Sequence, residues 1–432
     1  MWYNDSEGRF YALPDTVKND GGDEHMLATL IPLFDNTMNV PAYSIFAQRE
    51  NLLANPGLMG TGSLDMASRV FGLEIINNMG LDSVAADRRV FIEVNNISVF
   101  ADIENECKAD PAKIVLLANK SIKPTQQYVD RFAALKQKGF SVAIKGLAYT
   151  QFEEYKPLLT LLDYVLLDHK RVNITVARTY FAQRYPDLKL IAVNVNSREE
   201  YEALTGKEGY CMYEGEFFRV PIAVGDKDVA PLKVNYIELL NIVNAPDFDL
   251  TDAADVISRD TALVISLLEI VNKLSRNSEI TSVRHAAAML GQKELKKWIN
   301  TAVTRELCAD KPNEITRLSL LRAKFAENLA SIFEQAMFSS ELFLTGLFSV
   351  LDIILDKPME EALELVKVSR NIQDALIKHE GEFAQVLDFI VNYENASFQE
   401  VSRQMLLKGI DDDRIYDAYV QSLEWYRDMF LK

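Results

Sequence analysis

The chain has 432 residues, of which 48% are hydrophobic and 25% are charged, and its formal net charge is −17. This composition is typical of a folded globular protein and excludes a largely disordered one, while the length favours two or three domains. The acidic balance, without a clustered basic stretch, argues against a nucleic-acid-binding protein.

Residues 1–25 mix glycine, acidic and aromatic residues without regular periodicity, so we predict an N-terminal extension ahead of the first domain. The start of the chain is polar and does not resemble a secretory signal, which favours a cytoplasmic protein. The longest apolar stretch, 342–355, is too short to span a membrane, so we expect a core helix and no membrane partner. The three cysteines, Cys107, Cys211 and Cys308, are far apart and indicate free thiols.

Short apolar runs of strand length follow one another between residues 26 and 225. Residues 27–35 and 40–49 predict a pair of strands, and 89–99 predicts another. Three further runs alternate with helical patterns such as 127–138, and these runs are 114–117, 141–144 and 164–167. This alternation is typical of a parallel α/β unit, and in a (β/α) barrel the chemistry lies at the C-terminal ends of such strands.

The order of these runs, from LATLIPLFD through IVLLANK and VAIKG to LLDYVLLDHK, resembles the EAL domains, a family of cyclic di-GMP phosphodiesterases. The resemblance is greatest to the diverged EAL domain that is fused to an HDOD domain. It implies an N-terminal (β/α) barrel over residues 26–225, with metal-binding and catalytic carboxylates at the strand ends. At the positions of those carboxylates the chain holds neutral, apolar or basic residues, and these are Ser44, Leu117, Lys145, Gly146, Val193 and Asn196.

Other family positions differ as well. Glu93 stands where the family has a metal-binding Asn, and Leu166 replaces a Lys whose partner Asp is kept as Asp168. Near the end of the barrel Glu214 replaces a Gln, while Gly215 is retained and is expected to serve a turn. We therefore assign no catalytic, metal-binding or cofactor-binding residue. Lys145 is expected to form an internal ion pair with Glu93 and Asp168.

Residues 226–235, DKDVAPLKVN, are polar and predict a linker, so both domains are expected to be soluble when the chain is cut near Ala230.

Residues 236–432 show helical periodicity throughout. The segments ISRDTALVISLLEIVNKL and SVRHAAAMLGQ resemble the HDOD signature, with matches at Val271, Asn272, Ser282, Ala286, Leu290 and Gly291. None of the four histidines precedes an aspartate, so the metal site of the related HD hydrolases is not expected. The predicted fold is thus an α/β barrel followed by an all-α HDOD domain.

From these residues we predict a non-enzymatic bacterial regulator without cofactors. The resemblance implies that it acts through contacts with protein partners in motility, biofilm or gene-expression control. The sequence does not identify the partner, and a homo-oligomer is left open. One alternative is a receptor that binds cyclic di-GMP without cleaving it, although the changed carboxylates argue against binding. An active cyclic di-GMP phosphodiesterase is the third hypothesis.

Overall fold

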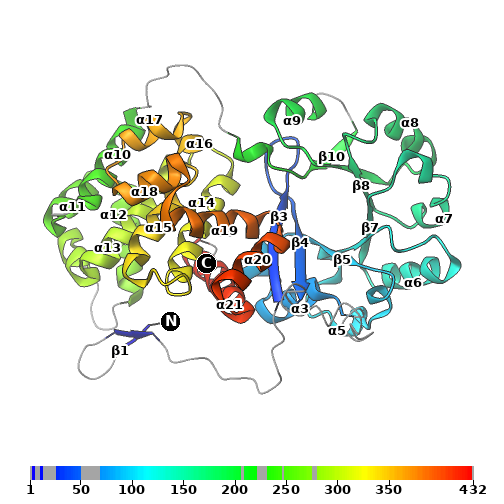
Figure 1. Ribbon diagram of the computed structural model, residues 1–432, viewed down its shortest axis with the longest axis horizontal. Helices are drawn as coiled ribbons and strands as arrows, with labels where there is room; N and C mark the ends of the chain where they lie inside the picture. Colours follow the sequence, from blue (N-terminus) through cyan, green and yellow to red (C-terminus); the bar gives the residue numbers. More distant parts are fainter. Residues whose placement is uncertain are drawn as a thin grey trace.

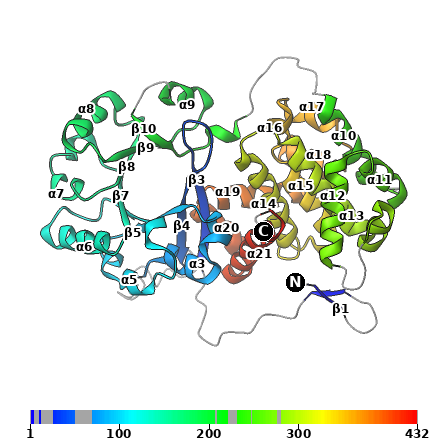
Figure 2. The same cartoon turned by 180° about the vertical axis from the view of Figure 1, so that it is seen from behind.

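The computed structural model describes residues 2–4, 10–12, 26–49, 69–205, 209–220, 231–245, 248–274 and 280–430. Figure 1 shows two lobes, one built around a ring of strands and the other entirely helical, and Figure 2 shows the same arrangement from behind. Residues 226–230 of the predicted linker and most of the predicted N-terminal extension lie outside the described residues.

Eight strands form one sheet in the order β10-β9-β8-β7-β6-β5-β4-β3. Their bounds are β3 Met26–Leu33, β4 Ala42–Arg49, β5 Arg89–Val94, β6 Ile114–Ala118, β7 Ser141–Lys145, β8 Tyr164–Asp168, β9 Lys189–Val193 and β10 Tyr210–Tyr213. The first pair, β3 and β4, is antiparallel, and every later pair is parallel. The backbone nitrogen of Phe34 donates to the carbonyl oxygen of Tyr213 at 2.8 Å, and the backbone nitrogen of Tyr213 donates to the carbonyl oxygen of Phe34 at 2.7 Å. This bridge joins the first strand to the last, so the predicted barrel and its opening strand pair are confirmed.

Alternate residues of the parallel strands point into and out of the ring, as the period of two requires. On β6, Val115 and Leu117 belong to the cluster inside the barrel, whereas Ile114, Leu116 and Ala118 pack outward against the helices. All five residues of this strand are buried, because helices cover its outer face.

The covering helices are short. Their bounds are α3 Phe71–Met79, α4 Leu81–Ala85, α5 Ile103–Glu106, α6 Gln126–Gln137, α7 Lys156–Leu159, α8 Ile174–Arg184 and α9 Arg198–Thr205. Single 3-10 turns lie between the elements, at η1 Ser98–Phe100, η2 Pro111–Lys113, η3 Tyr149–Gln151 and η4 Phe217–Arg219. The predicted helix 127–138 is found one residue earlier, as α6, while the predicted strand 89–99 ends at Val94 because η1 follows it.

The second lobe is helical throughout its described residues. Its helices are α10 Pro231–Asn244, α11 Leu250–Ile257, α12 Thr261–Leu274, α13 Val283–Leu307, α14 Asn313–Leu329, α15 Ser339–Phe348, α16 Leu351–Leu355, α17 Met359–Glu364, α18 Arg370–Gln373, α19 Gly381–Glu394, α20 Phe398–Lys408 and α21 Asp412–Phe430, with short turns at η5 Ala336–Phe338 and η6 Asp374–Lys378. Two predictions need correction. The predicted linker residues 231–235 already belong to α10, and the predicted core helix 342–355 is two helices, α15 and α16.

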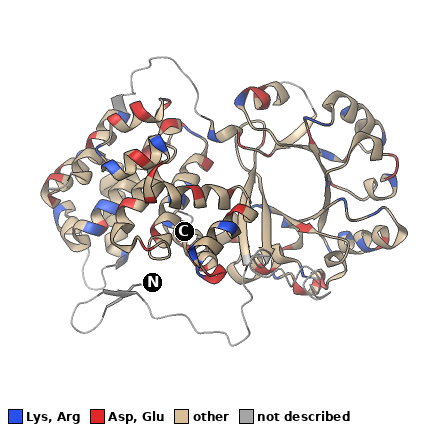
Figure 3. Cartoon of the chain, viewed as in Figure 1, with Lys and Arg blue, Asp and Glu red and all other residues tan. Residues whose placement is uncertain are grey.

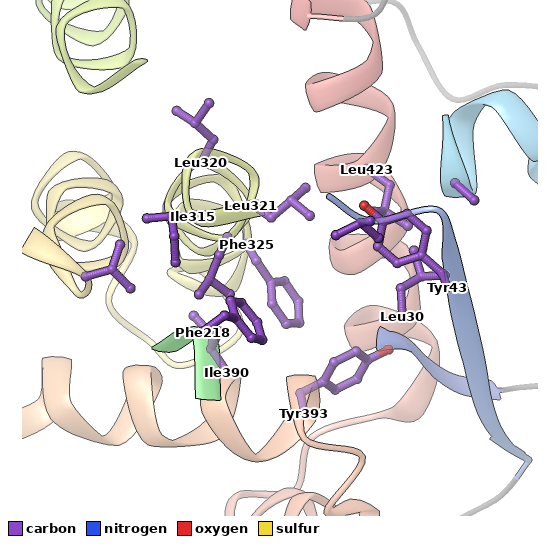
Figure 4. Close-up of a cluster of buried hydrophobic side chains, with 14 of the residues drawn as sticks. Leu30, Tyr43, Phe218, Ile315, Leu320, Leu321, Phe325, Ile390, Tyr393 and Leu423 are labelled. Atoms are coloured by element: carbon purple, nitrogen blue, oxygen red, sulfur yellow. The ribbon is translucent and has the colours of Figure 1, made fainter. Parts of the chain in front are cut away.

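The two lobes meet at the first strand of the barrel. Helices α19 and α21 both contact β3, and α21 also contacts α4. Figure 4 shows Leu30 and Tyr43 of the barrel lobe beside Phe325 and Tyr393 of the helical lobe. The hydroxyl oxygen of Tyr393 accepts a hydrogen bond from the backbone nitrogen of Ala28 at 3.1 Å, so the helical lobe provides a partner for a backbone group of β3. Buried side chains of both lobes form one continuous hydrophobic cluster.

Three features of the described residues bear on the remaining predictions. The predicted aperiodic extension contains a short antiparallel pair, β1 Trp2–Asn4 and β2 Phe10–Ala12. Cys107, Cys211 and Cys308 are free thiols. Within the described part of the chain, no helix combines the length and the apolar character needed to cross a bilayer.

Candidate functional site

A cavity of about 940 Å³ opens at the C-terminal ends of the barrel strands. It is lined by nearly all the strand-end residues that the sequence analysis examined, namely Ser44, Glu93, Leu117, Lys145, Gly146, Leu166, Asp168, Val193 and Glu214. Parallel strands present their C-terminal ends at one rim of a barrel, which explains why residues so far apart in the chain meet. Asn196 is not among the lining residues, and its backbone nitrogen instead donates to Oε2 of Glu200 at 2.8 Å.

Lys145 and Glu93 form an ion pair across the cavity. The Lys145 Nζ lies 2.5 Å from Glu93 Oε2, and the Asn119 side chain donates to the other carboxylate oxygen at 2.9 Å. The ammonium group also lies 4.8 Å from the centre of the Phe46 ring, within the range of a cation–π contact. The predicted pairing of Lys145 with Glu93 is therefore confirmed.

Asp168 is paired differently from the prediction. Its carboxylate lies 3.2 Å from Nε of Arg171 and accepts a hydrogen bond from the backbone nitrogen of Lys170 at 3.0 Å. The turn after β8 brings these groups to Asp168 within three residues, a local arrangement that satisfies the carboxylate without Lys145.

Glu214 brings a third carboxyl group to the cavity. Burial raises the pKa of this carboxyl to about 7, against an opposing effect from the positive charge of Lys145. The following residue, Gly215, packs against the backbone of Val195, and a Cβ atom added there would lie 1.9 Å from the Val195 oxygen. The retained glycine thus serves a close approach of two backbone segments, which fixes the position of Glu214.

The rest of the cavity is apolar at its floor and basic at its rim. Leu117, Leu166 and Val193 supply apolar surface, while Lys120, Lys123 and Arg171 add positive charge. The sequence analysis did not single out these three basic residues, although two of them follow β6 and one follows β8, where a barrel forms its binding loops. Throughout the described part of the chain, no three His, Cys, Asp or Glu side chains are grouped so that they would hold a metal ion.

A family model described as the HDOD domain matches residues 229–386, which covers most of the helical lobe. The barrel that precedes it covers the residues that resemble an EAL domain in sequence, and its strand-end residues line one cavity. The helical lobe therefore contains an HDOD domain, and the chain as a whole resembles EAL-HDOD proteins. The predicted HDOD domain and the predicted fold class are thereby confirmed.

Two curated proteins resemble this chain over most of its length, and solved structures resemble less than half of it. The cyclic di-GMP phosphodiesterase CdgJ of Vibrio cholerae is 25% identical over 370 residues, which cover 84% of each chain. The uncharacterized protein YuxH of Bacillus subtilis is 24% identical over 410 residues, covering 92% of this chain and 97% of YuxH. Among solved structures, the EAL domain of Mycobacterium smegmatis DcpA is 17% identical with a TM-score of 0.32, covering 44% of this chain and 90% of that domain.

The prediction that this chain is not an enzyme is wrong, because the relative CdgJ, aligned over 84% of the chain, is named a cyclic di-GMP phosphodiesterase. The same name conflicts with the expectation that cyclic di-GMP does not bind. Lost carboxylates, taken one position at a time, say nothing about the groups that other positions bring to the same cavity. Two such groups line the cavity: Glu214, which was noted only as the replacement for a Gln, and Asn119, which was not noted.

Proposed function

We propose that this EAL-HDOD protein acts in cyclic di-GMP signalling by binding the dinucleotide in the barrel cavity, and that the helical lobe passes the signal to protein partners. The observation that carries the proposal is the cavity of about 940 Å³ at the strand ends, which has four basic residues among its lining: Lys120, Lys123, Lys145 and Arg171. Binding sites for small molecules usually have volumes of about 300–1,000 Å³.

The cavity differs from the rest of the molecule in its charge. The chain carries a net charge of −17, and Figure 3 shows acidic and basic residues interspersed over both lobes. In the cavity, Glu93 and Asp168 are each paired with a cation. Lys120 and Lys123 form no ion pair with any residue that the structure describes, so they are available to the phosphates of a ligand.

The apolar part of the lining suits the bases of such a ligand. Leu117, Leu147, Leu166 and Val193 form surface against which a flat, weakly polar ring can pack. A cyclic dinucleotide combines two phosphates with two such rings, and the name of CdgJ indicates this class of ligand for a relative.

Binding is tested by calorimetric titration of the full chain with cyclic di-GMP, with and without magnesium. We expect saturable binding that weakens as salt is raised, because Lys120 and Lys123 contact phosphates through charge. Lys120→Ala combined with Lys123→Ala should weaken binding at least about ten-fold. The matched control is Lys156→Ala, an exposed lysine on α7 that does not line the cavity. No binding by the wild type, or equal binding by the double variant, contradicts the proposal.

Hydrolysis of the same ligand is the second candidate, favoured by the name of CdgJ and by the three carboxyl groups in the cavity. Chromatography of the titrated samples measures it directly as formation of the linear dinucleotide in the presence of magnesium or manganese. If the carboxylates take part, Glu93→Gln should abolish turnover, since Glu93 is the carboxylate held between Lys145 and Asn119. Turnover that persists in Glu93→Gln would exclude this carboxylate from the reaction.

A further inference from the structure

We infer that the barrel cavity and the contact between the two lobes are coupled, so that a ligand in the cavity loosens the docking of the helical lobe. This inference rests on the proposed binding of a ligand in the cavity. Two segments of the barrel carry it, because each has one residue in the cavity and a neighbouring residue in the contact with the helical lobe: strand β4 and the segment 214–219.

On β4, Ser44 lines the cavity and Tyr43 faces the helical lobe, since successive side chains of a strand point to opposite faces. The Tyr43 hydroxyl donates to Oε2 of Glu314 at 2.8 Å, and Glu314 in turn pairs with Arg317 at 3.1 Å. The Arg317 guanidinium lies 4.8 Å from the centre of the Tyr43 ring. A movement of β4 at the cavity therefore reaches a buried group of charges on α14.

The segment 214–219 makes the second connection. Glu214 lines the cavity, and four and five residues later Phe218 and Arg219 lie at the contact between the lobes. Arg219 donates to the side chain of Asn395 at 2.6 Å and lies 3.8 Å from the carboxylate of Glu394.

On the helical lobe, Glu394 also pairs with Arg322 at 2.9 Å, and the side chains of Arg219, Glu394 and Arg322 are only 14%, 12% and 7% exposed. A barrel arginine and a helical-lobe arginine thus share one carboxylate away from solvent. Removing a partner from such a buried group is costly, so the group favours a definite docked arrangement.

Lys145 links both segments to the ligand site. Its ammonium group contacts the ring of Phe46 on β4, and its charge acts on Glu214. Phosphates that bind Lys145 compete with its interactions with Phe46 and with Glu214. Losing these interactions leaves β4 and the segment 214–219 less firmly held. Because docking and binding are then linked, a change that loosens the contact between the lobes should increase affinity for the ligand, at most by the ratio of the affinities of the undocked and docked states.

The test compares Glu394→Gln and Tyr43→Phe with the wild type in calorimetric titrations with cyclic di-GMP. We expect each variant to bind at least about three-fold more tightly. The control, Glu400→Gln, removes an equivalent charge that pairs with Arg403 on its own helix α20, and its affinity should stay the same.

Ligand should also speed hydrogen exchange of β3 amides in the wild type, where the backbone nitrogen of Ala28 is hydrogen-bonded to Tyr393. Unchanged or weaker binding by both variants overturns the inference, and if Glu394→Gln fails to fold, Tyr43→Phe decides.

A second measurement separates this inference from the proposed function. If the wild type does not bind cyclic di-GMP, the proposed function fails, and the coupling is then judged without ligand. Lys145→Met removes the positive charge that lies over Phe46 and pairs with Glu93, so it should speed exchange of the β3 and β4 amides relative to the wild type and to the control Lys156→Met. Equal exchange in all three proteins overturns the coupling.

Discussion

Lys145 shows how a basic residue is accommodated in the cavity, at the end of a barrel strand. Its positive charge is compensated by Glu93 at 2.5 Å, and the Lys145 and Glu93 side chains are 27% and 37% exposed. An internal ion pair was expected from the sequence. Because both groups retain contact with solvent, the pair is worth much less than a fully buried one.

We predict that Lys145→Ala lowers the free energy of unfolding by about 1 kcal/mol, because Glu93 keeps its bond to Asn119 and partial access to water. Lys145→Asp should lower it further, since a new carboxylate would stand beside Glu93 and Glu214. Denaturant unfolding of both variants measures the two values. A Lys145→Asp variant as stable as the wild type would contradict the pairing.

Glu214 should make ligand affinity depend on pH. With a pKa raised to about 7, this carboxyl is mostly neutral at pH 6 and mostly ionised at pH 8. An ionised Glu214 repels a phosphate ligand, so cyclic di-GMP should bind at least about three-fold more weakly at pH 8 than at pH 6. Glu214→Gln removes the charge at both pH values, and titrations of this variant should show equal affinities. The same pH dependence in Glu214→Gln would assign the effect to another group.

At the scale of elements, the turn between β10 and η4 is held by backbone hydrogen bonds and by a close approach of two segments. The backbone nitrogen of Val195 donates a hydrogen bond to the backbone carbonyl oxygen of Glu214 at 3.1 Å. The backbone nitrogen of Phe217 donates to the carbonyl oxygen of Val195 at 3.2 Å. Gly215 lies between these two bonds, where its missing side chain lets the segments approach. The turn holds Glu214 on one side and leads directly into the contact with the helical lobe on the other.

We predict that Gly215→Ala destabilises the protein by about 3 kcal/mol, because the new Cβ would meet the Val195 oxygen at 1.9 Å. Gly146→Ala is the matched control. Gly146 also has a positive φ, +80°, but an added Cβ would meet no atom within 4 Å. Gly146→Ala should therefore show only the cost of the backbone conformation, about 1 kcal/mol. If chemical denaturation shows equal losses of unfolding free energy for the two variants, the close approach to Val195 does not contribute to the effect of Gly215→Ala.

At the scale of the whole molecule, the two lobes share a hydrophobic core. Phe325 and Tyr419 of the helical lobe lie with Leu30 and Phe218 of the barrel lobe around a cavity of only about 30 Å³. The charged groups described above are buried in the same contact. This arrangement differs from the expectation that polar residues 226–235 separate two independent domains.

We predict that fragments cut between residues 221 and 230 do not fold separately, since each would expose apolar surface that the other covers, including Leu30 on one side and Phe325 on the other. When both fragments are produced together, they should associate and copurify. Size-exclusion chromatography and near-UV circular dichroism distinguish these cases. Two monomeric fragments, each with a cooperative unfolding transition, would contradict the shared core.

The sequence by itself determined several of the strands and the residues at their C-terminal ends. The runs 114–117, 141–144 and 164–167 appear as strands that are each one residue longer, because apolar runs and turn residues act locally along the chain. The strand-end residues met in one cavity because parallel strands share a rim. The similarity of the helical segments to the HDOD signature was enough to locate that domain.

Only the tertiary structure decided what these residues contact. The closure of the barrel between Phe34 and Tyr213, the raised pKa of Glu214, and the bond from Ala28 to Tyr393 each join parts of the chain that local patterns do not connect. Individual positions in the sequence also do not show the charge and shape of the whole cavity. The prediction of a non-enzymatic protein, which was drawn from the lost carboxylates alone, was therefore wrong. Periodicity records which face of an element is buried, whereas the partner that buries it depends on how distant elements pack.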